Sequence, residues 1–209
     1  MPDAPAVPSR RTQQERSAAT QAALLDAAID CLIVDGYANT TTSRVAERAG
    51  LSRGAHLHHF QTRAALVAAA VERFATRRID ELQHEIERLP RGPDRTLRAL
   101  DLLWRLYSGP LFQAAVDLFA AARTDAELRA SLSRFERVIA RETVRLCRDL
   151  FAEQAGRRDF PQLLELVLST IRGLALLDIV QPGTSAAEAQ WRYCRGRLHA
   201  LLELPPATG

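Results

Sequence analysis

Basic side chains are concentrated in residues 41–63, a stretch with four arginines and one glutamate and therefore a net charge of +3. The arginines are Arg44, Arg48, Arg53 and Arg63. A guanidinium group neutralises DNA phosphates and forms paired hydrogen bonds with guanine, so this stretch is a candidate DNA contact. The whole chain carries only +3, and all 28 of its basic residues are arginine. Charge alone leaves open whether these arginines bind DNA or cover a solvated helix.

Three histidines in the same stretch raise the question of a metal site. His56 and His59 are three residues apart and could share a helix face, with His58 between them. Zinc requires three or four ligands with supporting groups, and no cysteine or carboxylate is close enough in sequence to complete a site. The sequence therefore predicts no metal site and no cofactor. We interpret His58 and His59 as donors to phosphates or base edges.

The elements that position these side chains are two short helices within residues 41–60. Thr41 can cap the first helix, because its hydroxyl accepts a hydrogen bond from a first-turn N–H. Gly50 suits the left-handed position that ends a helix, and Ser52 can cap the next one. Two helices joined by a tight turn form a helix-turn-helix, whose second helix lies in the DNA major groove.

Three motifs extend this pattern: GYxxTT at 36–41, VAERAGLSRG at 45–54 and HHFxTRxAL at 58–66. Together they resemble the N-terminal domain of TetR-type transcriptional repressors, without a gap from about residue 20 to 74. The rest of the chain resembles that family only in helical character and length. The resemblance implies a homodimer that represses transcription from a palindromic operator in double-stranded DNA until a small, largely apolar effector releases it.

The resemblance also implies which side chains contact DNA. Arg63 stands at the family position that usually carries a phosphate-binding lysine, whereas Ala55, Leu57 and His59 replace residues that usually bear hydroxyls. Of these, Ala55 and Leu57 are apolar. An apolar contact from either residue to a thymine methyl could substitute for a missing hydrogen bond. The predicted DNA-binding residues are Thr41, Thr42, Arg44, Ser52, Arg53, Gly54, Ala55, Leu57, His58, His59 and Arg63.

The whole chain is expected to be all-α with about nine helices, because no stretch alternates as a strand does. We expect a three-helix helix-turn-helix domain followed by a helical domain for ligand binding and dimerisation. The predicted segments are a disordered leader at 1–15, the DNA-binding domain at 16–77, the regulatory domain at 78–204 and a tail at 205–209. No apolar run approaches the roughly 20 residues that span a bilayer, and the N-terminus lacks a signal-peptide core. A cytoplasmic protein without a membrane partner is expected.

Aromatic and polar residues of the middle helices form a candidate effector site. Asp117 stands out because it lies between Val116 and Leu118 on a segment, 111–122, that is apolar on nearly every side and is expected to be buried. A buried carboxylate needs a partner, but ordinary core packing explains each aromatic equally well. The candidate ligand-binding residues are Trp104, Tyr107, Phe112, Gln113, Asp117, Phe119, Arg134 and Phe135.

The last two predicted helices, 161–180 and 185–204, carry more apolar surface than an exposed helix pair should. Two such pairs would form a four-helix bundle across a two-fold axis. The second helix of each helix-turn-helix, the reading helix, would then lie about 34–36 Å from that of the partner. An intramolecular core is the alternative. The predicted interface residues are Leu166, Ile171, Leu174, Leu177, Trp191, Cys194, Leu198 and Leu201.

Two other classes of function remain to be weighed. A helical enzyme could use the clustered histidines, but the chain has no nucleophile elbow, phosphate-binding glycine loop or HExxH motif. A helical interaction module would have no role on DNA. Cys31, Cys147 and Cys194 are too widely spaced for a metal cluster and are expected to be small buried residues in a reducing compartment.

Overall fold

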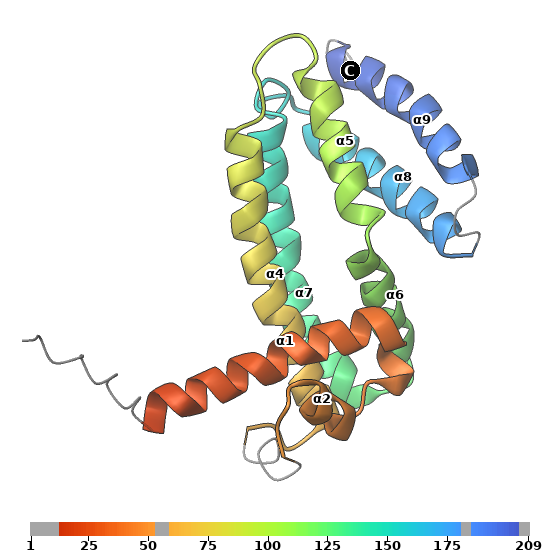
Figure 1. The fold of residues 1–209 in the computed structure, drawn as a ribbon. Coiled ribbons are helices and arrows are strands. Elements are labelled where there is room, and N and C mark those ends of the chain that lie inside the picture. Colours follow the sequence, from red (N-terminus) through yellow and green to blue (C-terminus); the bar gives the residue numbers. More distant parts are fainter. Residues whose placement is uncertain (1–12, 53–58, 181–184, 205–209) are drawn as a thin grey trace, which may run out of the picture. The chain divides into compact units, whose positions relative to one another are not determined.

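A computed structural model describes residues 13–52, 59–180 and 185–204 and confirms the all-α class, with eight helices and no strand in those ranges (Figure 1). The helices are α1 (Gln13–Asn39), α2 (Thr42–Arg48), α4 (Arg63–Glu87), α5 (Arg95–Tyr107), α6 (Pro110–Ala122), α7 (Ala126–Leu150), α8 (Phe160–Val180) and α9 (Ser185–Glu203). The second helix of the predicted helix-turn-helix falls on residues 53–58, which lie outside the described ranges.

The chain divides into two compact units, residues 1–71 and 72–209. The boundary between them lies inside α4, as does the predicted domain boundary after residue 77. Unit 1 therefore contains α1, α2 and the start of α4, and unit 2 contains the remaining helices.

Unit 1 has its own small core, formed where α1 packs on α2. Leu24, Ala28 and Cys31 of α1 and Val45 of α2 are fully buried. At Gly36 the backbone leaves helical geometry, with φ 71° and ψ 170°, so the regular part of α1 ends there. The left-handed φ suits glycine because a side chain there would clash with the backbone. This kink turns the chain toward α2.

Helix α1 is long and apolar enough, by length and composition alone, to cross a membrane. The expectation that no segment approaches that length was therefore wrong. The physical reason is that α1 is a core helix: its buried face contributes Leu24, Ala28 and Cys31 to unit 1, and such a helix resembles a membrane span in composition. Its charged Asp26 and Asp30 are exposed.

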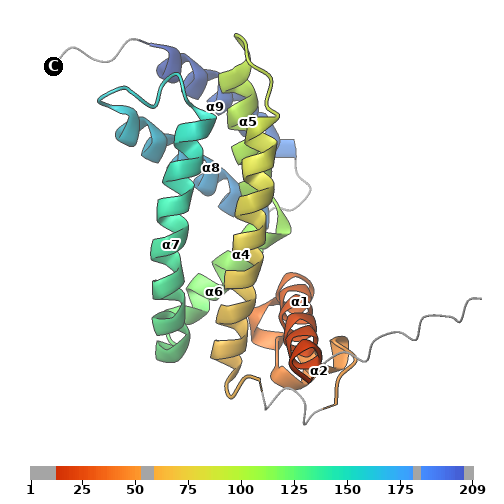
Figure 2. The ribbon, with the colours of Figure 1, turned by 90° about the vertical axis from the view of Figure 1, so that its left-hand side faces the viewer.

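Unit 2 has a larger core, in which α5, α8 and α9 lie against one another (Figures 1 and 2). Trp104 of α5 stacks on Trp191 of α9, with ring centroids 5.1 Å apart and an interplanar angle of 11°. Offset stacking of this kind adds to the gain from burying both rings. This pair therefore fixes α9 on α5.

Polar contacts secure the end of α9. Gln154, in the loop between α7 and α8, donates to Glu203 Oε1 at 3.0 Å, and Thr96 of α5 donates to the same oxygen at 2.8 Å. In that loop Arg157 donates to the carbonyl of Leu202 at 2.8 Å and also to that of Leu204. The two bonds from Arg157 satisfy carbonyls that have no partner within the helix. The loop between α7 and α8 thus holds α9 to the rest of unit 2.

Candidate nucleic-acid interface

Helix α2 begins at the residue that the sequence predicts as its cap. The backbone N–H of Arg44 donates to Thr41 Oγ1 at 3.2 Å, and Thr41 has the extended backbone of an N-cap. Thr42, the first residue of the helix, is half-buried. The hydroxyl of the fully buried Thr40 donates to the carbonyl of Gly36 at 2.8 Å. The GYxxTT segment therefore holds the start of α2 against the end of α1.

The turn that follows α2 has the hydrogen bonds of a Schellman motif. The N–H of Gly50 donates to the carbonyl of Glu47 at 3.0 Å, and the N–H of Leu51 donates to that of Ala46 at 2.9 Å. Gly50 has φ 68°, which confirms the predicted left-handed position. The turn is followed by Ser52, which is exposed. The chain thus leaves α2 in the geometry of a helix-turn-helix.

The predicted reading helix falls outside the described residues, with Arg53, Gly54, Ala55, Leu57 and His58. The predicted contacts of these residues with DNA therefore stay predictions. After them, half-buried His59 and buried Phe60 lead to Thr62, whose hydroxyl accepts from the N–H of Ala65 at 3.1 Å and caps α4.

One carboxylate pairs with two of the clustered arginines. Asp35, near the end of α1, has a side chain only 11% exposed. Arg44 Nη2 donates to its Oδ1 at 3.1 Å, and Arg48 Nη2 lies 3.2 Å from its Oδ2 as an ion pair without hydrogen-bond geometry. Asp35 was not predicted from the sequence because it precedes the stretch in which charge was counted. When Asp35 is counted as well, the sequence has four arginines and two acids here, and the local net charge falls to +2.

Arg63 makes contacts within unit 1. Its guanidinium carbon lies 3.9 Å from the centroid of the Tyr37 ring, and its Nη2 donates to the Tyr37 carbonyl. Its Nε is buried and donates no hydrogen bond within the described part of the chain. A cation over an aromatic face is attracted by the ring quadrupole. Arg63 thereby joins the start of α4 to the segment that precedes α2.

The candidate effector residues are divided between the core and the surface of unit 2. Trp104 is buried, while Tyr107, Phe112 and Phe135 are half-buried. Tyr107 packs edge-on against Phe112, with centroids 5.4 Å apart, and its hydroxyl accepts from Arg172 at 3.1 Å. Tyr107 and Phe112 pack against the core cluster that contains Trp104.

Helix α6 is not buried on every side, contrary to the expectation. Only one face, with Ala114, Leu118 and Ala122, is buried. Gln113 and Asp117 are exposed, and the side chain of Phe119 is 53% exposed. Asp117 therefore needs no buried partner. The side chain of Arg134 lies outside the described part of the structure.

The predicted interface residues also divide into two groups. One group is buried inside a single protomer and so leaves no surface for a partner: Ile171, Leu174, Trp191 and Leu198. The other three leucines are exposed, namely Leu166, Leu177 and Leu201, and Cys194 is half-buried. The buried group therefore belongs to an intramolecular core, which was the alternative to a dimer interface that the sequence left undecided.

A capped short helix followed by a left-handed glycine turn is the first part of a helix-turn-helix, the class of DNA-binding domain that the sequence predicts. A sequence model described as "Bacterial regulatory proteins, tetR family" matches residues 24–70. The HTH-type transcriptional regulator CymR of Pseudomonas putida is 31% identical over 179 residues, which cover 83% of this chain and 86% of CymR.

Two solved structures share the fold. A TetR transcription regulator from Haloarcula marismortui has a TM-score of 0.67 at 17% identity, covering 88% of this chain and 98% of that one. The regulator FadR from Bacillus subtilis, solved in complex with stearoyl-CoA, has a TM-score of 0.61 at 16% identity, covering 87% and 96% of the two chains. The chain belongs to the tetR family of bacterial regulatory proteins. It is a DNA-binding transcriptional regulator, and the alternative of a helical enzyme does not hold.

Proposed function

We propose that the protein is a homodimeric repressor in the cytoplasm that binds a palindromic operator and is released by a small, largely apolar effector. The observation that carries this proposal is the capped α2 with its Schellman turn at Gly50, in a chain of the tetR family. In a helix-turn-helix, the segment after this turn is the one that binds in the DNA major groove. The arginines beside it provide charge for phosphate contacts. The DNA-binding residues proposed are those predicted from the sequence apart from Arg63, whose guanidinium contacts Tyr37.

Dimerisation is supported by an exposed apolar stripe on α8. Leu166, Gly173, Leu177 and Val180 follow helical spacing along one face and are all exposed. Leu177 is 62% exposed, and no atom lies within 4 Å of a Cβ built on Gly173. A glycine flanked by apolar residues allows a second helix to approach closely. Exposed apolar patches of this kind mark contact surfaces.

Helix α9 carries a matching exposed stripe. Tyr193 and Leu201 of α9 and Leu204 just beyond its end share one face with Gly196, whose Cβ position is also open. Exposed Arg197 lies on the same face, with its guanidinium over the Tyr193 ring. Because α8 packs on α9 within the protomer, both stripes belong to one helix pair. Two copies of this pair could pack as a four-helix bundle across a two-fold axis. We therefore retain Leu166, Leu177 and Leu201 from the predicted interface and replace its buried members with Val180, Tyr193 and Leu204.

The effector part of the proposal is supported by a regulator of the same fold, FadR of Bacillus subtilis, which was solved with stearoyl-CoA. A ligand shifts an equilibrium between two states only by its difference in affinity for them. We propose that the effector favours a state of this protein with low operator affinity. Repression follows if the operator overlaps a promoter.

Selection of bound fragments from the source genome tests the proposal, starting with DNA upstream of the protein's own coding sequence. We expect one palindromic site, bound by a dimer with affinity that falls steeply as salt rises. A folded dimer that enriches no site would overturn the DNA-binding part.

The dimer surface is tested with Leu177→Glu, measured by analytical ultracentrifugation. An unpaired carboxylate buried at the interface costs about 3 kcal/mol or more, equivalent to a roughly 100-fold weaker dimer. Val144→Glu is the matched control, since Val144 is an exposed apolar residue on α7 outside the stripes. Equal dimer affinity of both variants would show that the stripe is not the interface.

A further inference from the structure

We propose that a cavity between α6 and α7 binds a small amphipathic anion, a molecule with an aromatic or alkyl body and a single carboxylate or sulfonate. The cavity is largely open to solvent and has a volume of about 480 Å³. It shares only Phe119 with the predicted effector residues. Its role as the effector site rests on the function proposed above, whereas binding itself does not.

The apolar part of the cavity comes from both helices. Ala122 of α6 and Leu132 of α7 are buried and line it, and Phe119 of α6 lines it with half of its surface exposed. Covering an exposed phenyl ring with another apolar group is favourable, because it removes apolar surface from water. Phe119 therefore provides a face on which the body of a ligand can lie.

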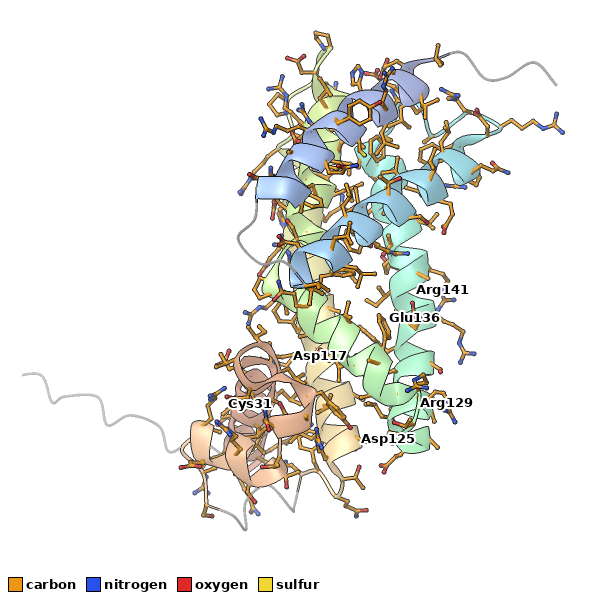
Figure 3. All side chains as sticks on the ribbon, turned by 90° about the vertical axis from the view of Figure 1, so that its right-hand side faces the viewer. Cys31, Asp117, Asp125, Arg129, Glu136 and Arg141 are labelled. Carbon is orange, nitrogen blue, oxygen red and sulfur yellow. The ribbon has the colours of Figure 1, made fainter. Side chains whose placement is uncertain are left out.

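The charged part of the cavity selects an anion. Arg123, Arg129 and Arg137 line the cavity together with one acid, Glu136, which gives a net charge of +2. Figure 3 shows Arg129 near the start of α7 and Glu136 farther along the same helix. A cationic ligand would meet three like charges. The planar guanidinium forms two parallel hydrogen bonds with a carboxylate, and sulfonate oxygens accept similar bonds.

The three arginines are not equivalent. Arg129 Nη1 donates to the carbonyls of Ala122 at 3.3 Å and Arg123 at 3.4 Å, so its head group is held at the end of α6. Within the described residues, the side chains of Arg123 and Arg137 make no hydrogen bond or ion pair. A ligand could engage these two guanidinium groups without breaking an existing contact. We therefore assign anion binding to Arg123 and Arg137.

The test uses two fluorescent probes that share one ring system. Anilinonaphthalenesulfonate is an amphipathic anion, and phenylnaphthylamine lacks the sulfonate. Binding is measured by titration of the full chain without DNA. We expect Arg123→Gln and Arg137→Gln each to weaken binding of the anionic probe about three- to tenfold, since each removes a charge-assisted contact. Binding of the neutral probe should not change.

Arg141→Gln is the matched control for the charge variants. Arg141 is an exposed arginine on the same helix (Figure 3) that does not line the cavity. Phe119→Ser should weaken both probes, because it removes the apolar face that they share. Glu136→Gln should tighten binding of the anionic probe by about twofold or more, because it removes a like charge near the anion.

Equal affinity of the anionic probe for Arg137→Gln, Arg123→Gln and Arg141→Gln would overturn the site. The regulator proposal is tested separately, by measuring operator affinity with and without the bound probe. Arg-dependent binding that leaves operator affinity unchanged would support the anion site and contradict its role as effector site.

Discussion

Replacement of Arg63 decides whether this side chain contacts DNA or positions the elements that do. Family resemblance suggests a phosphate contact, whereas the structure places the guanidinium on the Tyr37 ring and in a hydrogen bond to the Tyr37 carbonyl. Tyr37 lies four residues before Thr41, the cap of α2. We expect Arg63 to be a positioning residue that holds the entry to α2 against α4.

The expected energetic cost follows from these contacts. A cation–π contact at a partly exposed site contributes about 1 kcal/mol, and a hydrogen bond from a charged donor contributes at least about 1.5 kcal/mol. Because Arg63 is half-buried, we discount the sum and expect Arg63→Ala to lower the free energy of unfolding by about 2 kcal/mol. Tyr37→Leu should cost only about 1 kcal/mol, because it removes the ring but keeps the backbone carbonyl that accepts from Arg63. The double variant should cost less than the sum, because both changes remove the same interaction.

The assay is the dependence of operator affinity on salt. A protein that neutralises one phosphate fewer in duplex DNA shows a slope of log affinity against log salt that is shallower by about 0.9. A positioning role predicts weaker binding of Arg63→Ala with the slope unchanged, and a smaller weakening, also without a change of slope, in Tyr37→Leu. A slope that falls by about 0.9 per protomer, together with normal DNA binding by Tyr37→Leu, would refute this reasoning.

Three further predictions concern unit 1 and the cysteines. Asp35→Asn should strengthen binding to non-operator DNA and steepen its salt dependence by about 0.9, because one paired guanidinium becomes available to a phosphate; an unchanged slope in fluorescence anisotropy would contradict this. Gly50→Ala should cost about 1 kcal/mol or more in urea unfolding, since its φ is +68° although nothing lies within 4 Å of the new Cβ. Gly156→Ala, whose Cβ position is also open, should be neutral or slightly stabilising, and equal effects would dismiss the left-handed turn as the cause. Burial raises the pKa of Cys147 to about 12, so its thiolate should be scarce near pH 8 and iodoacetamide should modify Cys194 first, as judged by peptide mass spectrometry. Because the folded state holds this thiol proton more tightly, its contribution to stability should fall as pH rises above about 9.

Local rules of helix capping predicted the start and end of α2 correctly. Thr41, Gly50 and Thr62 each act within three to five residues of their own position, so the sequence contains nearly all the information that their roles require. Motif resemblance added the family and thus the DNA-binding role. These are the parts of the site that sequence could supply.

Contacts between distant residues were not predictable in the same way. The pairing of Asp35 with Arg44 joins two helices across a kink, and no spacing rule reports it. Apolar periodicity on α8 identified both Ile171 and Leu177, but it does not show which faces the protomer's own core. That distinction depends on where α5 and α9 pack. For α6, a composition apolar on all sides indicated burial, whereas its neighbours cover only one face.

The bonds that hold the end of α9 affect how two protomers could meet. The last turn of a helix near a chain terminus normally frays, so its amide hydrogens exchange rapidly with solvent. Here Arg157 and Gln154 hold the final turn in place within one protomer. A partner would therefore meet a surface that is already ordered, and association would not carry the entropy loss of folding that turn. Slow hydrogen exchange at this end of α9 should then be a property of the monomer as much as of the dimer.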